Sequence, residues 1–356
     1  MAGQSPTPSG DFRTSYAADM TIFPTRNSRI AMLLGLALLA CAPLLLGRYE
    51  LSLLIQIGFM GIAALGLNIL VGFTGQISIG HAAFFGFGAF ASAGFVAQGV
   101  PVPLAIPFAG IATALVGLVF GLPAARLKGL YLAIATLAAQ FILEDFFARA
   151  RWFSGGVAGR ITEPFSLFGF RFDREETYFY VVLFWVVIMF VAAANLMRSR
   201  DGRALIAVRD HYLSAELMGI NLAYYRTLSF GIASFYAGIA GALYAHYLLF
   251  VSVEAFNILF SIQFLAMVII GGLGSIMGSL MGAAFMVLLP EMVQSGAQAL
   301  QGSAIDTALA LGNSINFLRE MAIGAAIILF LVFEPDGLAH RWRLIKAYWK
   351  LYPYSH

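Results

Sequence analysis

A charged, helix-prone segment interrupts an apolar chain at residues 202–221, GRALIAVRDHYLSAELMGIN. Long apolar runs flank it on both sides. Charged residues make up only 11% of the 356 residues, and hydrophobic residues 60%. Average globular chains carry about a quarter charged residues, so this chain has too little polar surface to coat a soluble globule. The segment is therefore expected to lie in water beside a membrane domain.

The apolar runs predict an all-α, polytopic membrane protein. Several hold about 20 apolar residues, enough to cross a hydrocarbon core about 30 Å thick. In lipid the backbone must satisfy its own hydrogen bonds, which leaves helices or closed barrels. Barrel strands would alternate in segments of about 10 residues, whereas these runs are continuous. Ten spans are expected, at 30–47, 51–71, 78–98, 103–122, 129–147, 177–197, 228–250, 258–273, 276–294 and 315–334.

The basic residues predict which side of the membrane each connection faces. With both termini in the cytoplasm, the basic connections at 123–128 and 198–227 and the tail at 335–356 all fall inside. The loop at 148–176 falls outside although it carries five arginines, but it also holds four acidic residues. We expect residues 1–29 to form a flexible cytoplasmic tail and 30–334 to form the membrane domain.

The charged segment at 202–221, within the connection at 198–227, has an uneven helical pattern. Asp201-Gly202 predicts a turn, followed by helix formers whose apolar members share one broad arc. Arg209 and Glu216 fall inside that arc, which a simple surface helix would avoid. Two short helices broken near residues 210–214 and docked on a partner fit better. The alternative is an interfacial helix lying on lipid headgroups.

Glycine clusters occur in two places. Gly72, Gly75 and Gly80, with Gln76 and His81 beside them, form the first, and Gly271, Gly272 and Gly274 form the second. Glycine permits positive φ and weakens a helix by about 1 kcal/mol. The clusters are candidate hinges or unwound turns along a translocation path. Broken helices or re-entrant turns are therefore alternatives to full spans at 72–94 and 271–282. The alternative is close helix packing without motion.

The two clusters also resemble each other, because residues 70–77 (LVGFTGQI) are similar to residues 269–276 (IIGGLGSI). Transport folds often contain duplicated halves with broken helices at matching positions. Small residues also recur wherever membrane helices pack closely, which leaves duplication open.

Polar residues inside the expected spans are few, and ionisable groups at such positions are functional candidates by default. Most lie near predicted span ends, where a wet interface accounts for them. His81 could face a pathway, although a capping or packing role suits it better. The set is Gln56, Asn68, His81, Gln140, Glu144, Asp145, His246, Gln263 and Glu291.

Several motifs resemble the permeases of ATP-binding-cassette importers for branched-chain amino acids, LivM type, a family shared with urea and sugar permeases. The charged segment is similar to their cytoplasmic coupling segment. Residues 66–84 and 271–282 are similar to their glycine signatures. Residues 124–131 and 333–339 resemble their cytoplasmic turn and the exit from their last span. The loop at 153–159 keeps the family's paired glycines but lacks the Asp-Gly that usually follows.

The resemblance implies a permease subunit in the bacterial inner membrane that moves branched-chain or other hydrophobic amino acids. It implies a homologous second permease, two ABC ATPase subunits and an extracytoplasmic solute-binding protein docked on the outer loops. Membrane lipid is the remaining partner, and nucleic acid is not expected. The coupling residues would be Gly202, Arg203, Ala207, Arg209, Asp210, Ala215, Glu216, Gly219, Ile220 and Asn221.

Missing motifs narrow the function further. The chain has no G-x-x-x-x-G-K-[ST] loop, no metal-spaced His/Cys cluster and no nucleophile elbow. We therefore expect neither an enzyme nor a bound cofactor or metal, and ATP would bind to partner subunits. An ion-coupled secondary transporter or channel is the competing class, but it would need carboxylates near the bilayer midplane. A scaffold that transports nothing is a second alternative.

Overall fold

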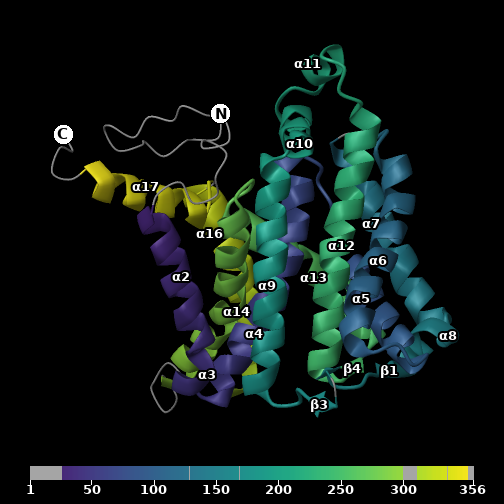
Figure 1. Cartoon of the computed structure of the whole chain (residues 1–356), viewed down its shortest axis with the longest axis vertical. Helices are drawn as coiled ribbons and strands as arrows, with labels where there is room; N and C mark the ends of the chain where they lie inside the picture. The colour runs from purple at the N-terminus through teal and green to yellow at the C-terminus, as the bar shows by residue number, and fades with distance from the viewer. Residues whose placement is uncertain (1–25, 128, 168, 300–310, 335, 352–356) are drawn as a thin grey trace.

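The computed structural model describes residues 26–127, 129–167, 169–299, 311–334 and 336–351 (Figure 1). Long helices run roughly side by side, and the all-α prediction is confirmed. The α-helices are α2 (Arg26–Ala40), α3 (Ala42–Leu45), α4 (Arg48–Asn68), α5 (His81–Ala97), α6 (Val102–Ala124), α7 (Leu130–Arg149), α8 (Arg151–Ser154), α9 (Glu175–Arg198), α10 (Arg200–Asp210), α11 (Tyr212–Leu217), α12 (Leu222–Leu248), α13 (Ile258–Gly271), α14 (Ile276–Ala299), α16 (Leu311–Phe333) and α17 (Leu338–Leu351).

Six helical segments in the described residues are long and apolar enough to cross a membrane. They correspond to the predicted spans at 51–71, 103–122, 129–147, 177–197, 228–250 and 276–294. The first combines α4 with a π-helix, η1 (Ile69–Phe73). The pair Glu320–Phe333 and Leu338–Tyr348 adds at most one more, because it bends by 50°.

The prediction of ten spans is not confirmed, because the remaining segments are short or broken. The predicted span at 30–47 is interrupted at Cys41, between α2 and α3. Helix α5 has 17 residues and α13 has 14. At about 1.5 Å per residue, α13 reaches only about 21 Å, less than a hydrocarbon core of about 30 Å. Both short helices end or begin at a glycine cluster.

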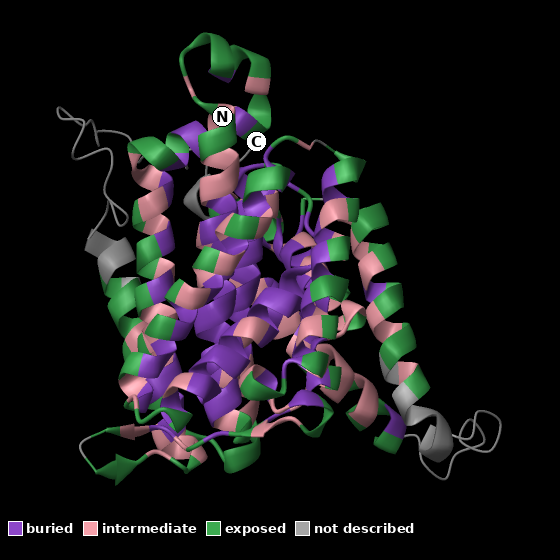
Figure 2. Cartoon of the chain, turned by 90° about the vertical axis from the view of Figure 1, so that its right-hand side faces the viewer, coloured by how far each residue is buried: buried purple, intermediate pink, exposed green. Residues whose placement is uncertain are grey.

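Helix α12 forms the centre of the bundle and packs against α4, α5 and α6. Glycines allow its backbone to approach theirs closely. A Cβ at Gly241 would lie 1.9 Å from the Phe85 carbonyl oxygen, and one at Gly117 would lie 2.1 Å from the Ser234 Oγ. Figure 2 shows buried residues concentrated in this interior. Membrane helices associate through such packing because lipid tails are as apolar as the side chains.

Polar elements occupy the two ends of the bundle. Helices α10 and α11 project at one end, which also carries α17 (Figure 1). The opposite end carries short antiparallel strand pairs, β1 (Arg160–Ile161) with β4 (Phe250–Val251) and β2 (Ser166–Leu167) with β3 (Phe170–Arg171). The 3₁₀ turns η2 (Gly156–Ala158) and η3 (Val253–Phe256) complete the connections. The charged segment and the loop at 148–176 thus lie at opposite ends.

The predicted tails are described only in part. Residues 1–25 of the expected 1–29 tail lie outside the described residues, and α2 begins at Arg26, inside that range. The predicted tail at 335–356 contains α17, and residues 335 and 352–356 lie outside the description.

Adding one methyl group at Gly88 should destabilise the bundle. A Cβ there would lie 2.4 Å from the Gly238 Cα, whereas one at Gly94, on the same helix, meets nothing closer than the Arg160 Nη1 at 3.6 Å. Both alanines gain the same helix propensity, so the difference isolates the clash. We expect Gly88→Ala to be less stable than Gly94→Ala by about 1–3 kcal/mol, measured by thermal unfolding in detergent. Equal unfolding temperatures would contradict the close α5–α12 contact.

Candidate functional site

The two glycine clusters meet at Asn68, the last residue of α4. Its fully buried side chain donates from Nδ2 to the Ser275 carbonyl oxygen at 2.9 Å and to the Ser279 Oγ at 2.8 Å. Its Oδ1 accepts from the Gly274 backbone N–H at 2.9 Å. A buried amide left without partners would cost about 1–3 kcal/mol. Asn68 lies where α4 continues into η1, and it therefore fixes this helix against the break between α13 and α14.

Backbone groups approach one another closely around this amide. A Cβ at Gly72 would lie 2.3 Å from the Gly274 nitrogen, and one at Gly271 would lie 2.0 Å from the Gly278 carbonyl oxygen. Gly274 also has a φ of +73°, which disfavours any side chain. The similar segments 70–77 and 269–276 are therefore in direct contact.

Arg209 joins the charged segment to this contact. It lies near the end of α10, and its Nη1 donates to the Gly72 carbonyl oxygen at 2.7 Å. The position of a Cβ on Gly274 lies 3.0 Å from the same nitrogen, and one on Gly75 lies 3.0 Å from the Arg209 Cγ. Asp210 accepts from the Arg209 Nε at 2.9 Å. This role explains why an arginine stands inside the apolar arc of the segment.

Gln76 connects the first break to the start of α12. Its side chain is buried, and Nε2 donates to the Ser229 Oγ at 2.6 Å and to the Arg226 carbonyl oxygen at 3.4 Å. Its Oε1 is buried and has no hydrogen-bond partner among the described residues. The end of η1 is thus tied to α10 through Arg209, and the non-helical segment that follows it is tied to α12 through Gln76.

A separate polar cluster holds the buried start of α5. The Gln140 Oε1 accepts from the Ala83 N–H at 2.9 Å, and the Ser261 Oγ accepts from the Ala82 N–H at 2.9 Å. These bonds satisfy donors that have no partner within the helix. The His81 Nε2 lies 2.9 Å from the Ala63 carbonyl oxygen, and a Cβ on Gly80 would lie 2.3 Å from the Thr136 carbonyl oxygen. His81 and Gly80 are packed here, apart from Arg209.

Helices α10 and α11 form two short helices, as predicted, with the break at His211. The predicted turn at Asp201-Gly202 is wrong, because these residues lie in the first turn of α10. The side chain of Ser199 caps that turn by accepting from the Gly202 N–H at 3.2 Å. The capping serine thus satisfies the N–H of Gly202, three residues downstream, which has no partner within the helix.

The end of α11 is a Schellman motif. Gly219 has a φ of +85°, its N–H donates to the Glu216 carbonyl oxygen, and the Ile220 N–H donates to the Ala215 carbonyl oxygen. Asn221 then caps α12 by accepting from the Tyr224 N–H at 3.1 Å.

The outer side of this turn is apolar and unusually exposed. Leu217 is 88% exposed and Met218 is 84% exposed, with Glu216 beside them. On α10, Arg203 and Asp210 are exposed and Ala207 is half-buried, while Ala215 is buried. We call residues 212–221 the α11 turn.

A wet interface at the span ends does not account for three of the polar residues, which are buried. Asn68 and Gln140 are fully buried, and His246 is 2% exposed. Ser275, Ser279 and Ser261, which complete their networks, were not singled out from the sequence. The sequence feature that could have indicated these networks is the position of each amide: Asn68 lies near the first glycine cluster in the chain, and Gln140 contacts its end in the fold.

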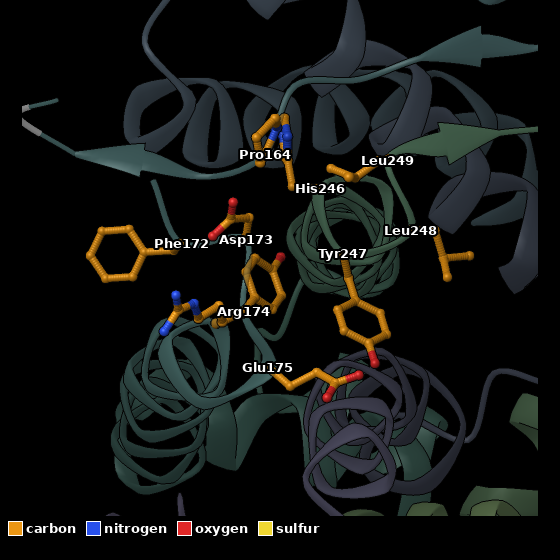
Figure 3. A pocket seen from close by; sticks show the side chains of 10 residues that line it. Pro164, Phe172, Asp173, Arg174, Glu175, His246, Tyr247, Leu248 and Leu249 are labelled. Carbon is orange, nitrogen blue, oxygen red and sulfur yellow. The ribbon is translucent and has the colours of Figure 1, made fainter. Parts of the chain in front are cut away.

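A cavity of about 280 Å³ opens at the end opposite the α11 turn (Figure 3). Its mouth carries charged side chains of both signs from the predicted outer loop. His246 also lines the cavity, where it is held by the Ser92 Oγ at 2.8 Å and the Glu163 carbonyl oxygen at 2.7 Å. The lining residues are Pro164, Phe172, Asp173, Arg174, Glu175, Tyr178, His246, Tyr247, Leu248 and Leu249.

The fold and this site define a multi-pass α-helical membrane protein with two broken helices joined to an exposed polar helix pair. Within the described residues, no group of three or more His, Cys, Asp or Glu side chains could hold a metal ion.

The chain belongs to the family described as branched-chain amino acid transport system / permease component, which it matches over residues 49–332. It is similar to the "High-affinity branched-chain amino acid transport system permease protein LivM" of Salmonella typhimurium and of Escherichia coli. Each is 27% identical over 258 residues, covering 65% of this chain and 56% of the relative.

A "Probable branched-chain amino acid transport permease protein LivM" of Methanocaldococcus jannaschii is 28% identical over 236 residues, covering 66% of this chain and 67% of the relative. The chain thus spans little more than half the length of the first two relatives. No solved structure matches significantly.

Replacing Asn68 should weaken the contact between the two breaks more than removing one of its partners. Asn68→Ala leaves the Gly274 N–H and the Ser279 hydroxyl without this partner, and we expect a loss of about 2–4 kcal/mol. Ser279→Ala removes a single bond and should cost about 1 kcal/mol. Thermal unfolding of both variants and of the double variant gives the coupling energy. Additive losses would show that the two side chains do not interact.

Proposed function

We propose that this chain is the transmembrane permease subunit of an ATP-binding-cassette importer, and that an ATPase subunit docks on the α11 turn. The observation that carries the proposal is the Arg209–Gly72 hydrogen bond, because it links an exposed surface to the π-helix η1 inside the bundle. The exposed Leu217 and Met218 supply the apolar centre that a docking surface needs.

Motion of the docked ATPase would reach the bundle in two steps. First, α10 and α11 move together and carry Arg209, which pulls on the Gly72 carbonyl group. Second, the helix formed by α4 and η1 moves with the α13–α14 break, since Asn68 of that helix binds Ser275 and Gly274. Glycines in the non-helical segments 74–80 and 272–275 let the adjoining helices change angle at low cost. Inward-open and outward-open states would then shift in population as the ATPase binds and hydrolyses ATP.

The remaining partners follow from the same arrangement. The α11 turn and both termini would face the cytoplasm, with the chain in a bacterial inner membrane. A homologous second permease would complete the pathway, and a second ATPase would dock on it. A solute-binding protein would dock at the opposite end, where the cavity carries Asp173, Arg174 and Glu175. Charges of both signs suit a zwitterionic solute there.

The proposed cargo is a branched-chain or other hydrophobic amino acid. The family description supports this choice. The scarcity of charge along the spans supports it too, because a strongly charged solute would need a fixed counter-charge. Urea is the alternative cargo in this class. ATP would bind only to the partner subunits, and this chain would need no cofactor.

Breaking the α11 turn should release the ATPase. Gly219→Pro removes the Gly219 N–H and forbids the φ of +85°. Gly99→Pro is the matched control, because Gly99 has a φ of +89°, has no neighbour within 4 Å of its Cβ position and donates to Val96. We expect Gly219→Pro to abolish ATPase co-purification and amino-acid uptake, while Gly99→Pro keeps the ATPase bound.

Charge reversal gives an independent check on the same surface. Glu216→Arg is expected to abolish co-purification of the ATPase, whereas Glu254→Arg, an exposed glutamate in η3 at the other end, retains it. Retention of the ATPase and of uptake in both Gly219→Pro and Glu216→Arg would refute docking on the α11 turn.

Arg209 should act after docking. Arg209→Gln loses the charged hydrogen bond to Gly72, a bond of a type worth about 1.5–3 kcal/mol. We expect the ATPase to stay bound while ATP-driven leucine uptake in proteoliposomes falls by about 10-fold to 100-fold. Arg126→Gln, an exposed basic residue between α6 and α7, serves as the control with normal uptake. Uptake on an ion gradient without any ATPase would instead identify a secondary transporter.

A further inference from the structure

Helix α17 has two chemically different faces. His340, Arg343 and Lys346 recur every three residues, and so do Trp342, Ile345 and Tyr348. The second set follows the first by two residues, which is about 200° around a helix. Basic and apolar side chains therefore lie on opposite sides of α17.

The apolar side is uncovered in the described chain. Trp342 is 56% exposed, Ile345 is 50% exposed and Tyr348 is 61% exposed. Figure 1 shows α17 running sideways from the bundle at the end that carries α10 and α11. It bends by 50° from the preceding helix, so it leaves the direction of the span.

One arginine lies on the apolar side, and it is neutralised locally. Arg341 lies between Ile345 and Tyr348 around the helix and donates to the Glu334 carboxylate. This hydrogen bond holds the pKa of Glu334 below its usual value. The apolar side of α17 therefore presents an ion pair rather than a free positive charge.

The start of α17 is fixed to the functional site. Gly337, with a φ of +73°, lies against Gly272, and a Cβ there would lie 2.6 Å from the Gly272 nitrogen. Ala339 is buried beside the same glycine. A partner that fixes the position of α17 therefore also fixes the position of the α13–α14 break.

We propose that α17 lies in the plane of the membrane and binds anionic phospholipid headgroups on the α10–α11 side, which anchors the α13–α14 break at a fixed depth. Aromatic and aliphatic side chains on one face with lysine and arginine on the other is the pattern of helices that lie in the headgroup region. Arg343 and Lys346 supply the charge that attracts anionic lipid. This inference goes beyond the proposed transport function and does not depend on an ATPase.

Site-specific labels on the full-length chain test the position of each face. In a Cys41→Ala background, Ile345→Cys and Ala347→Cys place a nitroxide on opposite sides of α17. The chain is inserted in nanodiscs of phosphatidylcholine with or without phosphatidylglycerol. With phosphatidylglycerol, we expect the label at 345 to be accessible to oxygen and shielded from a water-soluble nickel chelate, and the label at 347 to show the reverse.

Charge variants separate lipid from protein as the occupant. Arg343→Gln with Lys346→Gln should lower the equilibrium constant for binding of α17 to the headgroups, read from the label at 345 in phosphatidylglycerol discs, by about 10-fold to 30-fold. Arg343→Lys with Lys346→Arg should leave it unchanged, because a headgroup surface requires charge rather than a particular hydrogen-bond geometry. Arg126→Gln is the control for charge elsewhere at the same end.

Two outcomes would overturn the proposal. One is equal nickel accessibility at 345 and 347 in phosphatidylglycerol discs. The other is shielding at 345 that arises only when the ATPase or a second permease is added, since a protein would then cover α17. The measurement uses the permease alone, so its result does not depend on whether the ATPase docks or the chain transports a solute.

Discussion

The contact between two broken helices organises this protein, and one buried amide holds it. Asn68 binds the carbonyl group of Ser275, the hydroxyl of Ser279 and the N–H of Gly274, all from the α13–α14 region. Away from water, unpaired backbone groups are costly. Helices can therefore stop inside the bundle only where side chains satisfy the freed groups. Asn68 satisfies the Gly274 N–H at the α13–α14 break. Gln140 and Ser261 satisfy the N–H groups at the start of α5.

The rest of the bundle adapts to these breaks. Helix α12 packs against α4, α5 and α6 through glycines, because lipid offers no hydrophobic drive for association and only close packing remains. Arg209 and Gln76 then tie the first break to α10 and α12. Separate hydrogen bonds thus connect the α4–η1 region to the exposed polar end, to α12 and to the α13–α14 break.

Much of the fold could be predicted from composition and periodicity. The apolar runs predicted the helical membrane class and six of the observed membrane-length segments. The glycine clusters predicted breaks near 72–80 and 271–275. Span number could not be predicted in this way, because α5 and α13 are apolar along their whole length, yet stop short at the breaks. Hydropathy reports the polarity of a segment but not how far it extends as a helix.

Local sequence patterns therefore determined the all-α class, the two short helices of the charged segment and the glycine-rich places where helices are interrupted. The tertiary structure alone decided which of these meet. Nothing near Arg209 in the chain indicates that it reaches Gly72, 137 residues away. Likewise, the sequence shows Asn68 only as a polar residue near a span end, whereas in the fold it is buried against the α13–α14 region. Long-range hydrogen bonds depend on how helices pack, and packing geometry is a property of the whole bundle.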